Sequence, residues 1–261
     1  MTARSTVGRC PLVVVAQALL TLAGVLYAGV VLEAVVGWPL DPARSYLSEL
    51  AALDQPTSGL FRSTDLVAGI LVVTGLVLLV LAHRRRRALG HPAASLAQCV
   101  TAWALVGFGV ATVADALLPL DCALSLGECA AREDAGSVSL AHQAHTYSSV
   151  ASGVGSFVAS AGVVWLARAR RRSLLGLSAR LAGALGPVLG VVTGAIGLFG
   201  SPLPVGTGIV QRVQVVAFAV VLVLAAQVLA APQRPRRPRS SRRPPPAGPA
   251  HALAEAGPRR A

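Results

Sequence analysis

Residues 64–87 read TDLVAGILVVTGLVLLVLAHRRRR, in which an apolar run from Thr64 to Ala82 is followed by arginines at positions 84–87. A helix needs about 20 predominantly apolar residues to cross the roughly 30 Å hydrocarbon core of a bilayer. The run has that length, and arginine is enriched in loops on the cytoplasmic side of membranes. The segment therefore predicts a membrane-spanning helix whose C-terminal end faces the cytoplasm.

Five further apolar segments of similar length flank this one. The predicted spans cover about Pro11–Val36, Thr64–Ala82, Ala93–Leu118, His142–Ala167, Leu181–Phe199 and Gly208–Ala231. The chain is 54% hydrophobic and 13% charged, whereas about 25% of the residues in soluble domains are charged. The sequence predicts an all-α integral membrane protein: a six-transmembrane-helix bundle over residues 11–231, after a short N-terminus of residues 1–10. The first apolar run is too long for a signal peptide core of roughly 7–15 residues.

Charge is divided between the two ends of these spans. Nineteen of the 23 basic residues, all arginine, lie in the N-terminus, two short loops and the C-terminal tail. Ten of the 11 acidic residues lie at the opposite span ends. This asymmetry predicts cytoplasmic N and C termini, with residues 38–62, 121–141 and 201–207 outside. Because the arginines are dispersed between spans, we exclude nucleic acid as a partner despite the pI near 11.3, and we expect contact with the lipid bilayer.

The tail, residues 232–261, is rich in arginine and proline and carries little apolar surface. Such a composition predicts disorder. We expect this basic tail and the arginine-rich loops to bind anionic lipid at the cytoplasmic surface.

The cysteines agree with this topology. Cys122 and Cys129 lie seven residues apart on the predicted outer side, where oxidising conditions favour a disulfide. Cys10 and Cys99 lie near the predicted inner face and should stay reduced. Four free thiols are the alternative, and a metal site built on this pair is disfavoured because no second close pair accompanies it.

The first outer loop carries a pattern of its own. Asp41-Pro42 resembles a helix start, and Tyr46, Leu47, Leu50 and Leu53 follow at helical spacing. This spacing predicts a short amphipathic helix at the outer interface. The helix either forms a lid over the bundle, which we favour, or turns Ser48 and Glu49 inward to line a cavity.

Several ionisable residues lie at the outer span ends. We expect them to form one polar cluster beneath the outer-loop helix, because polar groups in spans avoid lipid by facing inward. The expected members are Asp65, Asp115, Asp121, His142, His145 and Arg212. One interpretation is a set of ion pairs and hydrogen bonds that ties the helix ends together. The other is a metal site in which Asp65, Asp115, His142 and His145 bind zinc with one open position.

The stretch from Ser45 to Ala51, followed by Pro56 and Phe61, resembles a bacterial multi-pass membrane family catalogued as domain of unknown function 998. Pro119-Leu120-Asp121 and His142 are similar to that family's second motif. The resemblance runs from the first span to the sixth. It implies a protein of the bacterial plasma (inner) membrane, and it maps the motif residues onto Ser48, Glu49, Asp121 and His142 as candidate catalytic residues.

A more distant likeness is to ceramidase-like membrane hydrolases, which use serine, aspartate and histidines around zinc. The paired histidines of that family are four residues apart, whereas His142 and His145 are three apart. Two hypotheses stand side by side. The first is a non-enzymatic protein that handles lipid or solute, or acts as a scaffold, with a charged vestibule at its outer face. The alternative is a membrane-embedded, metal-dependent hydrolase acting on a lipid or envelope substrate at the outer leaflet. The sequence alone does not decide whether the protein is an enzyme.

Overall fold

The computed structural model describes residues 10–168, 174–199 and 205–230. These residues form helices and no strand, and six of the helices are long and apolar enough to cross a membrane. The long helices are α1 (Pro11–Ala28), α3 (Ser58–Ala88), α4 (Leu96–Leu117), α6 (Leu140–Ala167), α7 (Leu174–Phe199) and α8 (Thr207–Leu229). Three short helices, α2 (Val30–Val35), η1 (Leu47–Ala51) and α5 (Gly127–Asp134), lie between them. The predicted all-α, six-span fold class is confirmed.

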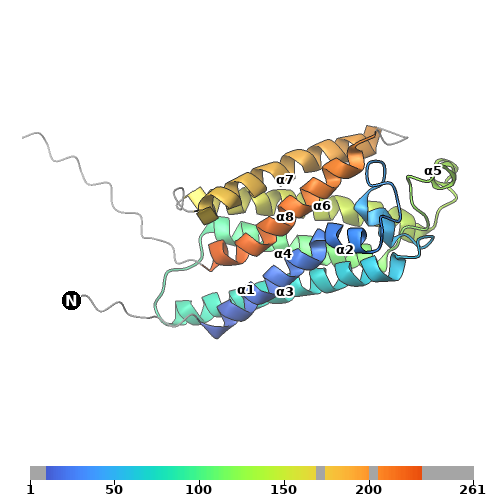
Figure 1. Cartoon of the computed structure of the whole chain (residues 1–261). Coiled ribbons are helices and arrows are strands. Elements are labelled where there is room, and N and C mark those ends of the chain that lie inside the picture. Colours follow the sequence, from blue (N-terminus) through green and yellow to red (C-terminus); the bar gives the residue numbers. More distant parts are fainter. Residues whose placement is uncertain (1–9, 169–173, 200–204, 231–261) are drawn as a thin grey trace, which may run out of the picture. The chain divides into compact units, whose positions relative to one another are not determined.

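The six long helices form a ring in the order α1, α3, α4, α6, α7, α8, and α8 packs back against α1 (Figure 1). Helix α8 has the largest share of buried residues among the six long helices, and α1 is much more exposed. At the centre, the Phe108 ring lies 5.0 Å from the ring of Tyr27 and 4.6 Å from that of Phe218, both edge-on. Three helices thus share one aromatic contact.

Helices α3 and α4 approach each other through glycine. A Cβ atom placed on Gly69 would lie 2.6 Å from the carbonyl oxygen of Gly109, and one on Gly109 would lie 3.0 Å from that of Gly69. Small residues permit such close backbone contact between membrane helices, where packing and not the hydrophobic effect drives association. No larger residue fits at Gly69 without separating the two helices.

The first span is not one continuous helix as the sequence predicted. Gly29 ends α1 with a φ of +59°, a conformation that side chains disfavour. A Cβ atom there would also lie 2.9 Å from the Leu47 side chain. The break redirects the chain into α2, which turns Glu33 into the bundle, where it is fully buried.

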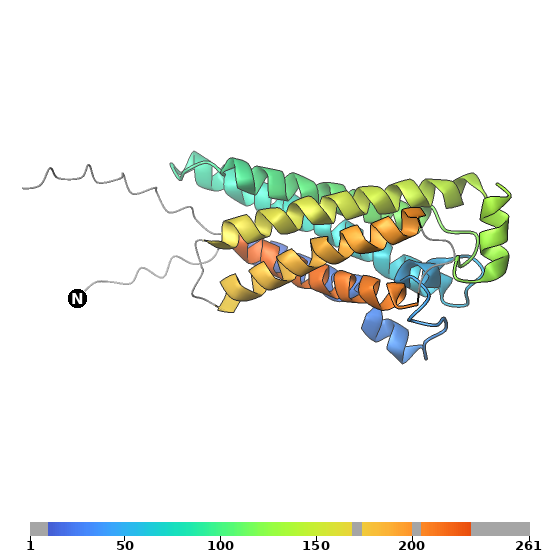
Figure 2. The same cartoon turned by 90° about the horizontal axis from the view of Figure 1, so that it is seen from above.

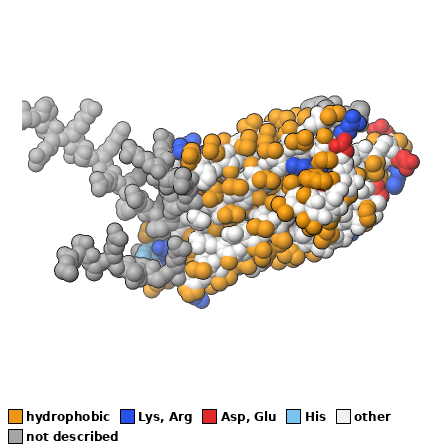
Figure 3. Space-filling model, in the orientation of Figure 1, with side chains coloured by type: hydrophobic (Ala, Val, Ile, Leu, Met, Phe, Trp, Pro, Cys, Tyr) orange, Lys and Arg blue, Asp and Glu red, His pale blue; other side chains and the backbone are white. Residues whose placement is uncertain are grey.

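The loops gather at two ends of the bundle. Residues 36–57 and 118–139 lie at one end, and the α3–α4 connection lies at the other (Figure 2). On the face shown in Figure 3, acidic side chains gather at the first of these ends and apolar side chains cover the body. At the second end, Gln98 Nε2 and Arg86 Nη1 donate to the carbonyl oxygens of Leu229 and Ala230, at 3.0 and 3.4 Å. These bonds satisfy carbonyls that a helix end leaves free. The predicted disordered tail, the N-terminus and most of the third outer loop lie outside the described residues.

The predicted orientation is testable with single cysteines at the two ends. Glu133 in α5 and His91 in the α3–α4 connection are both exposed. In a Cys10→Ala, Cys99→Ala background, we expect a membrane-impermeant maleimide to label Glu133→Cys in intact cells and His91→Cys only after permeabilisation. The opposite labelling pattern would invert the topology.

Candidate functional site

The outer-loop helix is present but differs from its prediction. It is the single 3-10 turn η1, and its residues Leu47, Leu50 and Ala51 are buried in place of lying at the interface. The chain makes one turn at Asp41-Pro42, but no helix continues from it to Tyr46. In this turn the Asp41 carbonyl oxygen accepts from the backbone N–H groups of Arg44 and Ser45, at 3.0 and 2.9 Å, and Asp41 Oδ1 accepts from the Ala43 N–H at 2.9 Å. The backbone carbonyl oxygens that follow do not continue a helix, because they accept hydrogen bonds from a buried arginine.

That arginine is Arg212 of α8. Its Nε donates to Glu33 Oε2 at 2.7 Å, and its Nη2 meets Glu33 Oε1. Its Nη1 donates to the carbonyl oxygens of Ser45 and Pro42, at 2.7 and 3.0 Å. A Cβ atom on Gly208 would collide with these same two carbonyls. The interaction joins α2, the first outer loop and α8 in one buried, charge-assisted network.

Glu49, a candidate catalytic residue, is fully buried. Its carboxylate accepts hydrogen bonds from the backbone of two loops. Its Oε1 accepts from the Tyr46 backbone N–H at 2.8 Å, and its Oε2 accepts from the Ser125 N–H at 2.7 Å. Asp54 adds a second connection by accepting from the Ala123 N–H at 3.1 Å. These carboxylates hold the first two outer loops together, which is a structural role.

The second outer loop contains the predicted disulfide. Cys122 and Cys129 are bonded to each other and buried, so this prediction is confirmed. Beside them, Asp121 accepts from the backbone N–H and the hydroxyl of Ser139, both at 2.6 Å. The Asp121 N–H in turn donates to His142 Nδ1 at 3.1 Å. These bonds fix the start of α6, where Ser139 is the N-cap. The hydrogen bonds from Ser139 lower the pKa of Asp121.

The histidines face the bundle, but their partners are mainly backbone atoms. His145 Nδ1 donates to the Leu118 carbonyl oxygen at 2.8 Å and lies 3.8 Å from Asp115 Oδ1. Among the described residues, the group spaced for a metal ion is Cys122, Cys129 and His142, whose two sulfurs are joined in the disulfide. The predicted zinc ligands Asp65, Asp115, His142 and His145 do not form such a group.

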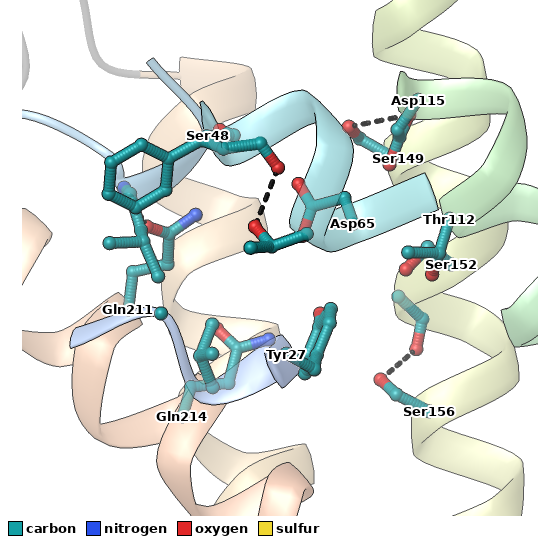
Figure 4. A pocket seen from close by; sticks show the side chains of 16 residues that line it. Tyr27, Ser48, Asp65, Thr112, Asp115, Ser149, Ser152, Ser156, Gln211 and Gln214 are labelled. Atoms are coloured by element: carbon teal, nitrogen blue, oxygen red, sulfur yellow. Dashed lines mark hydrogen bonds between the residues drawn. The ribbon is translucent and has the colours of Figure 1, made fainter. Parts of the chain in front are cut away.

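A polar cavity of about 150 Å³ lies in the half of the bundle that carries η1, which is the predicted outer half (Figure 4). We call it the outer polar cavity. Its polar lining residues are Tyr27, Ser48, Thr64, Asp65, Thr112, Asp115, Ser149, Ser152, Ser156, Gln211 and Gln214. Ser48 thus lines a cavity, as the second interpretation of the outer loop expected, although Glu49 does not.

Both carboxylates of the cavity lie at a similar depth. Asp65 is nineteen residues from Arg84 along α3, and Asp115 is nineteen residues from the start of α4. At 1.5 Å per residue each distance is roughly 28 Å, close to the thickness of the hydrocarbon core. With the predicted topology, this count places Asp65 and Asp115 near the outer boundary of the hydrocarbon.

Neither carboxylate has a basic partner of the kind that Glu33 has. Asp115 accepts hydrogen bonds from Ser148 and, at 3.3 Å, from Ser149. Within the described parts of the chain, Asp65 has no hydrogen bond or ion pair, and no arginine nitrogen lies within 4.0 Å of either carboxylate. Asp115 has His145 Nδ1 at 3.8 Å as its basic neighbour. Buried or half-buried charges are normally paired, so Asp65 is the acid that stands apart.

The hydrogen bonds and ion pairs of the described residues do not join the expected polar cluster into one network. The structure divides it into three groups: Arg212 with Glu33, Asp121 with His142, and Asp65 with Asp115 in the cavity. His145 lies between the last two. The sequence reasoning missed Tyr27, Thr112, Ser148 and Ser149 as functional candidates. The adjacent serines at 148 and 149, one helical turn beyond His145 in a predicted span, were the available signal.

The Glu33–Arg212 pair should dominate the stability of the outer end. Replacing Arg212 with methionine leaves Glu33 charged, buried and without its partner, which costs about 3–5 kcal/mol. We expect a loss of this size in the free energy of unfolding in mild detergent. The Arg44–Asp41 pair is exposed, so Arg44→Met should change it by less than about 1 kcal/mol. Equal losses in the two variants would contradict this assignment.

The hydrogen bonds between Asp121 and Ser139 should make the stability depend on pH. The pKa of Asp121 is lowered in the folded state. The contribution of Asp121 to the free energy of unfolding is therefore complete above the unfolded-state pKa of about 3.9 and is lost as pH falls through the folded-state pKa. We expect Asp121→Asn to be less stable than the native protein by about 2 kcal/mol at pH 7. That difference should shrink below about pH 4. Asp134→Asn, at an exposed acid, serves as the control. A stability difference between Asp121→Asn and the native protein that stays constant with pH would contradict the role of Asp121.

Comparison with known proteins identifies the family of this chain. The family model "Protein of unknown function (DUF998)" matches residues 21–228, which includes all six long helices in whole or in part. No curated protein and no solved structure matches the chain. The match covers most of the chain, and with the six spans it makes this protein a multi-pass membrane member of the DUF998 family.

Proposed function

We propose that this protein binds a small protonated amine in the outer polar cavity, as a non-enzymatic component that handles solute or lipid in the membrane. The observation that carries the proposal is the pair of carboxylates, Asp65 and Asp115, which line one cavity. Asp65 has no hydrogen bond or ion pair among the described residues, and the basic neighbour of Asp115 is His145, at 3.8 Å. A bound cation would offset the cost of holding both charges at the edge of the hydrocarbon.

The other lining groups suit an ammonium group better than a bare metal ion. Hydroxyl groups of Ser48, Thr64 and Ser149 supply hydrogen-bond acceptors. The ring of Tyr27 adds an aromatic surface that attracts organic cations. A cavity of about 150 Å³ is comparable to engineered cavities that hold a molecule as large as benzene. That volume matches an organic amine of a few heavy atoms.

The hydrolase hypothesis lacks its ligand set. Asp121 and His142 are engaged with each other and with Ser139, and His145 donates to a backbone carbonyl. Ser48 is the candidate catalytic residue that lies in the cavity, and it lies there without a histidine of the proposed set among the lining residues. We therefore propose the binding function and not the hydrolase activity.

The cellular setting follows from the predicted topology. With the arginine-rich end in the cytoplasm, the outer polar cavity faces the exterior of what we propose to be the bacterial plasma membrane. A ligand then reaches the cavity from outside the cell or from the outer leaflet.

The proposal is tested by binding of ethanolamine to the full-length protein in phosphatidylcholine nanodiscs. Ethylene glycol, which lacks the charge, is the matched probe. We expect ethanolamine to raise the thermal midpoint and ethylene glycol to leave it unchanged. Asp65→Asn and Asp115→Asn should each weaken ethanolamine binding at least tenfold, because each removes one of two charges facing the ligand.

Glu133→Asn provides the control, since Glu133 is an exposed acid in α5. It should bind ethanolamine as the native protein does. Equal responses to both probes, or undiminished binding in Asp65→Asn, would refute the amine site.

A further inference from the structure

The outer polar cavity is bounded by α1, η1, α3, α4, α6 and α8, and no described residue of α7 lines it. Helix α7 nevertheless packs against both α6 and α8 in the ring. Helix α7 can therefore close the cavity wall between α6 and α8 only at the levels where it contacts both helices.

Helices α6 and α7 are close at the cytoplasmic end and separate toward the outer end. A Cβ atom on Gly183 would lie 2.6 Å from Val164 Cγ2 and 3.1 Å from the Ser160 carbonyl oxygen, which shows tight packing. At Gly194, eleven residues further along α7, the same atom would meet nothing within 4 Å.

Helix α7 follows α8 instead of α6 at this level. Thr193 Oγ1 donates to Gln214 Oε1 at 2.8 Å, and a Cβ atom on Gly190 would lie 3.0 Å from Gln214 Nε2. The side of α6 that carries Ser149, Ser152 and Gly153 is thus left without α7 beside it.

Gly153 marks the place where the cavity meets the outside of the bundle. It lines the cavity, it is exposed, and a Cβ atom there would meet nothing within 4 Å. Gly153 lies fifteen residues from Arg168 along α6, or roughly 22 Å. That depth is inside the hydrocarbon core of about 30 Å, so Gly153 faces acyl chains and not water.

We infer that the outer polar cavity opens sideways at Gly153, between α6 and α7, and that its ligand is the amine headgroup of a lipid in the outer leaflet. The inference rests on the proposed amine function. Asp65 and Asp115 lie near the hydrocarbon boundary, which is the depth of lipid headgroups. A lipid amine can reach them through the opening while its acyl chain stays in the bilayer. The serines of α6 line the way with hydroxyl groups.

The test compares a lipid-borne amine with a free one, using the full-length protein in phosphatidylcholine nanodiscs. Dodecylamine is the lipid-borne probe, dodecanol its uncharged match, and ethanolamine the free amine. We expect dodecylamine, but not dodecanol, to raise the thermal midpoint. Gly153→Phe, which places a ring in the opening, should weaken dodecylamine binding at least tenfold more than it weakens ethanolamine binding.

Gly107→Phe is the matched control. Gly107 is an exposed glycine of α4 with nothing within 4 Å of its Cβ position, and it does not line the cavity. It should bind both amines as the native protein does, and both variants should keep the native thermal midpoint without ligand.

The outcomes separate the two proposals. Unchanged dodecylamine binding in Gly153→Phe, or an equal loss of both amines, would overturn the lateral opening while leaving the amine site in place. Failure of both amines to bind the native protein would overturn the amine site itself. Binding of dodecanol as tight as that of dodecylamine would show that the opening takes acyl chains without recognising the headgroup, which also overturns the inference.

Discussion

The buried contact between Arg212 and Glu33 determines the structure of the outer end. A charge within the bundle is tolerated only when its desolvation is offset by good geometry and by hydrogen bonds to the remaining atoms. Arg212 meets this requirement by donating both to Glu33 and to the carbonyls of Pro42 and Ser45. Those carbonyls belong to the loop that leads into η1. The ion pair therefore fixes the place from which Ser48 reaches the outer polar cavity.

The acidic residues of the outer end have different hydrogen-bond and ion-pair partners. This difference separates structural from functional residues. Glu33 is paired with a guanidinium, Glu49 with two backbone N–H groups, and Asp121 with Ser139. Each of these carboxylates has its charge satisfied by the protein. Asp65, in contrast, faces the cavity without any such partner among the described residues. An acid that the fold leaves unsatisfied near the hydrocarbon boundary indicates an external partner more strongly than any of the motif residues does.

The spans were predictable because they depend on local properties. An apolar run of membrane length and the arginines that follow it lie within one stretch of sequence, and their physics requires no knowledge of the rest of the chain. The disulfide was predictable for the same reason, since seven residues separate its cysteines. The break at Gly29 was missed because glycine occurs within many membrane helices without ending them. Only the Leu47 side chain, from a distant loop, makes that position special.

The site was predictable in its residue types but not in its pairing. Helical spacing correctly places His142 and His145 on one face, and both are buried. Their nearest polar atoms, however, come from the backbone of residues 118 and 121, whose positions are set by a loop. Glu33 and Arg212 are separated by 179 residues, and no local pattern joins them. Sequence spacing thus identifies which groups must avoid lipid, whereas loop conformation decides which of them meet.

The distribution of small and polar residues along the bundle explains how one fold combines stability with a cavity. At the end with the α3–α4 connection, Gln98 and Arg86 close the end of α8, and Gly183 is packed against α6. At the other end, side-chain bonds join the helices to loops, while Gly69 and Gly109 keep α3 and α4 in close contact one turn from Asp65. Dispersion contacts between close backbones are what hold membrane helices together in the absence of a hydrophobic driving force. Close contact between α3 and α4 therefore holds the bundle together beside the cavity, where polar side chains leave space for a ligand.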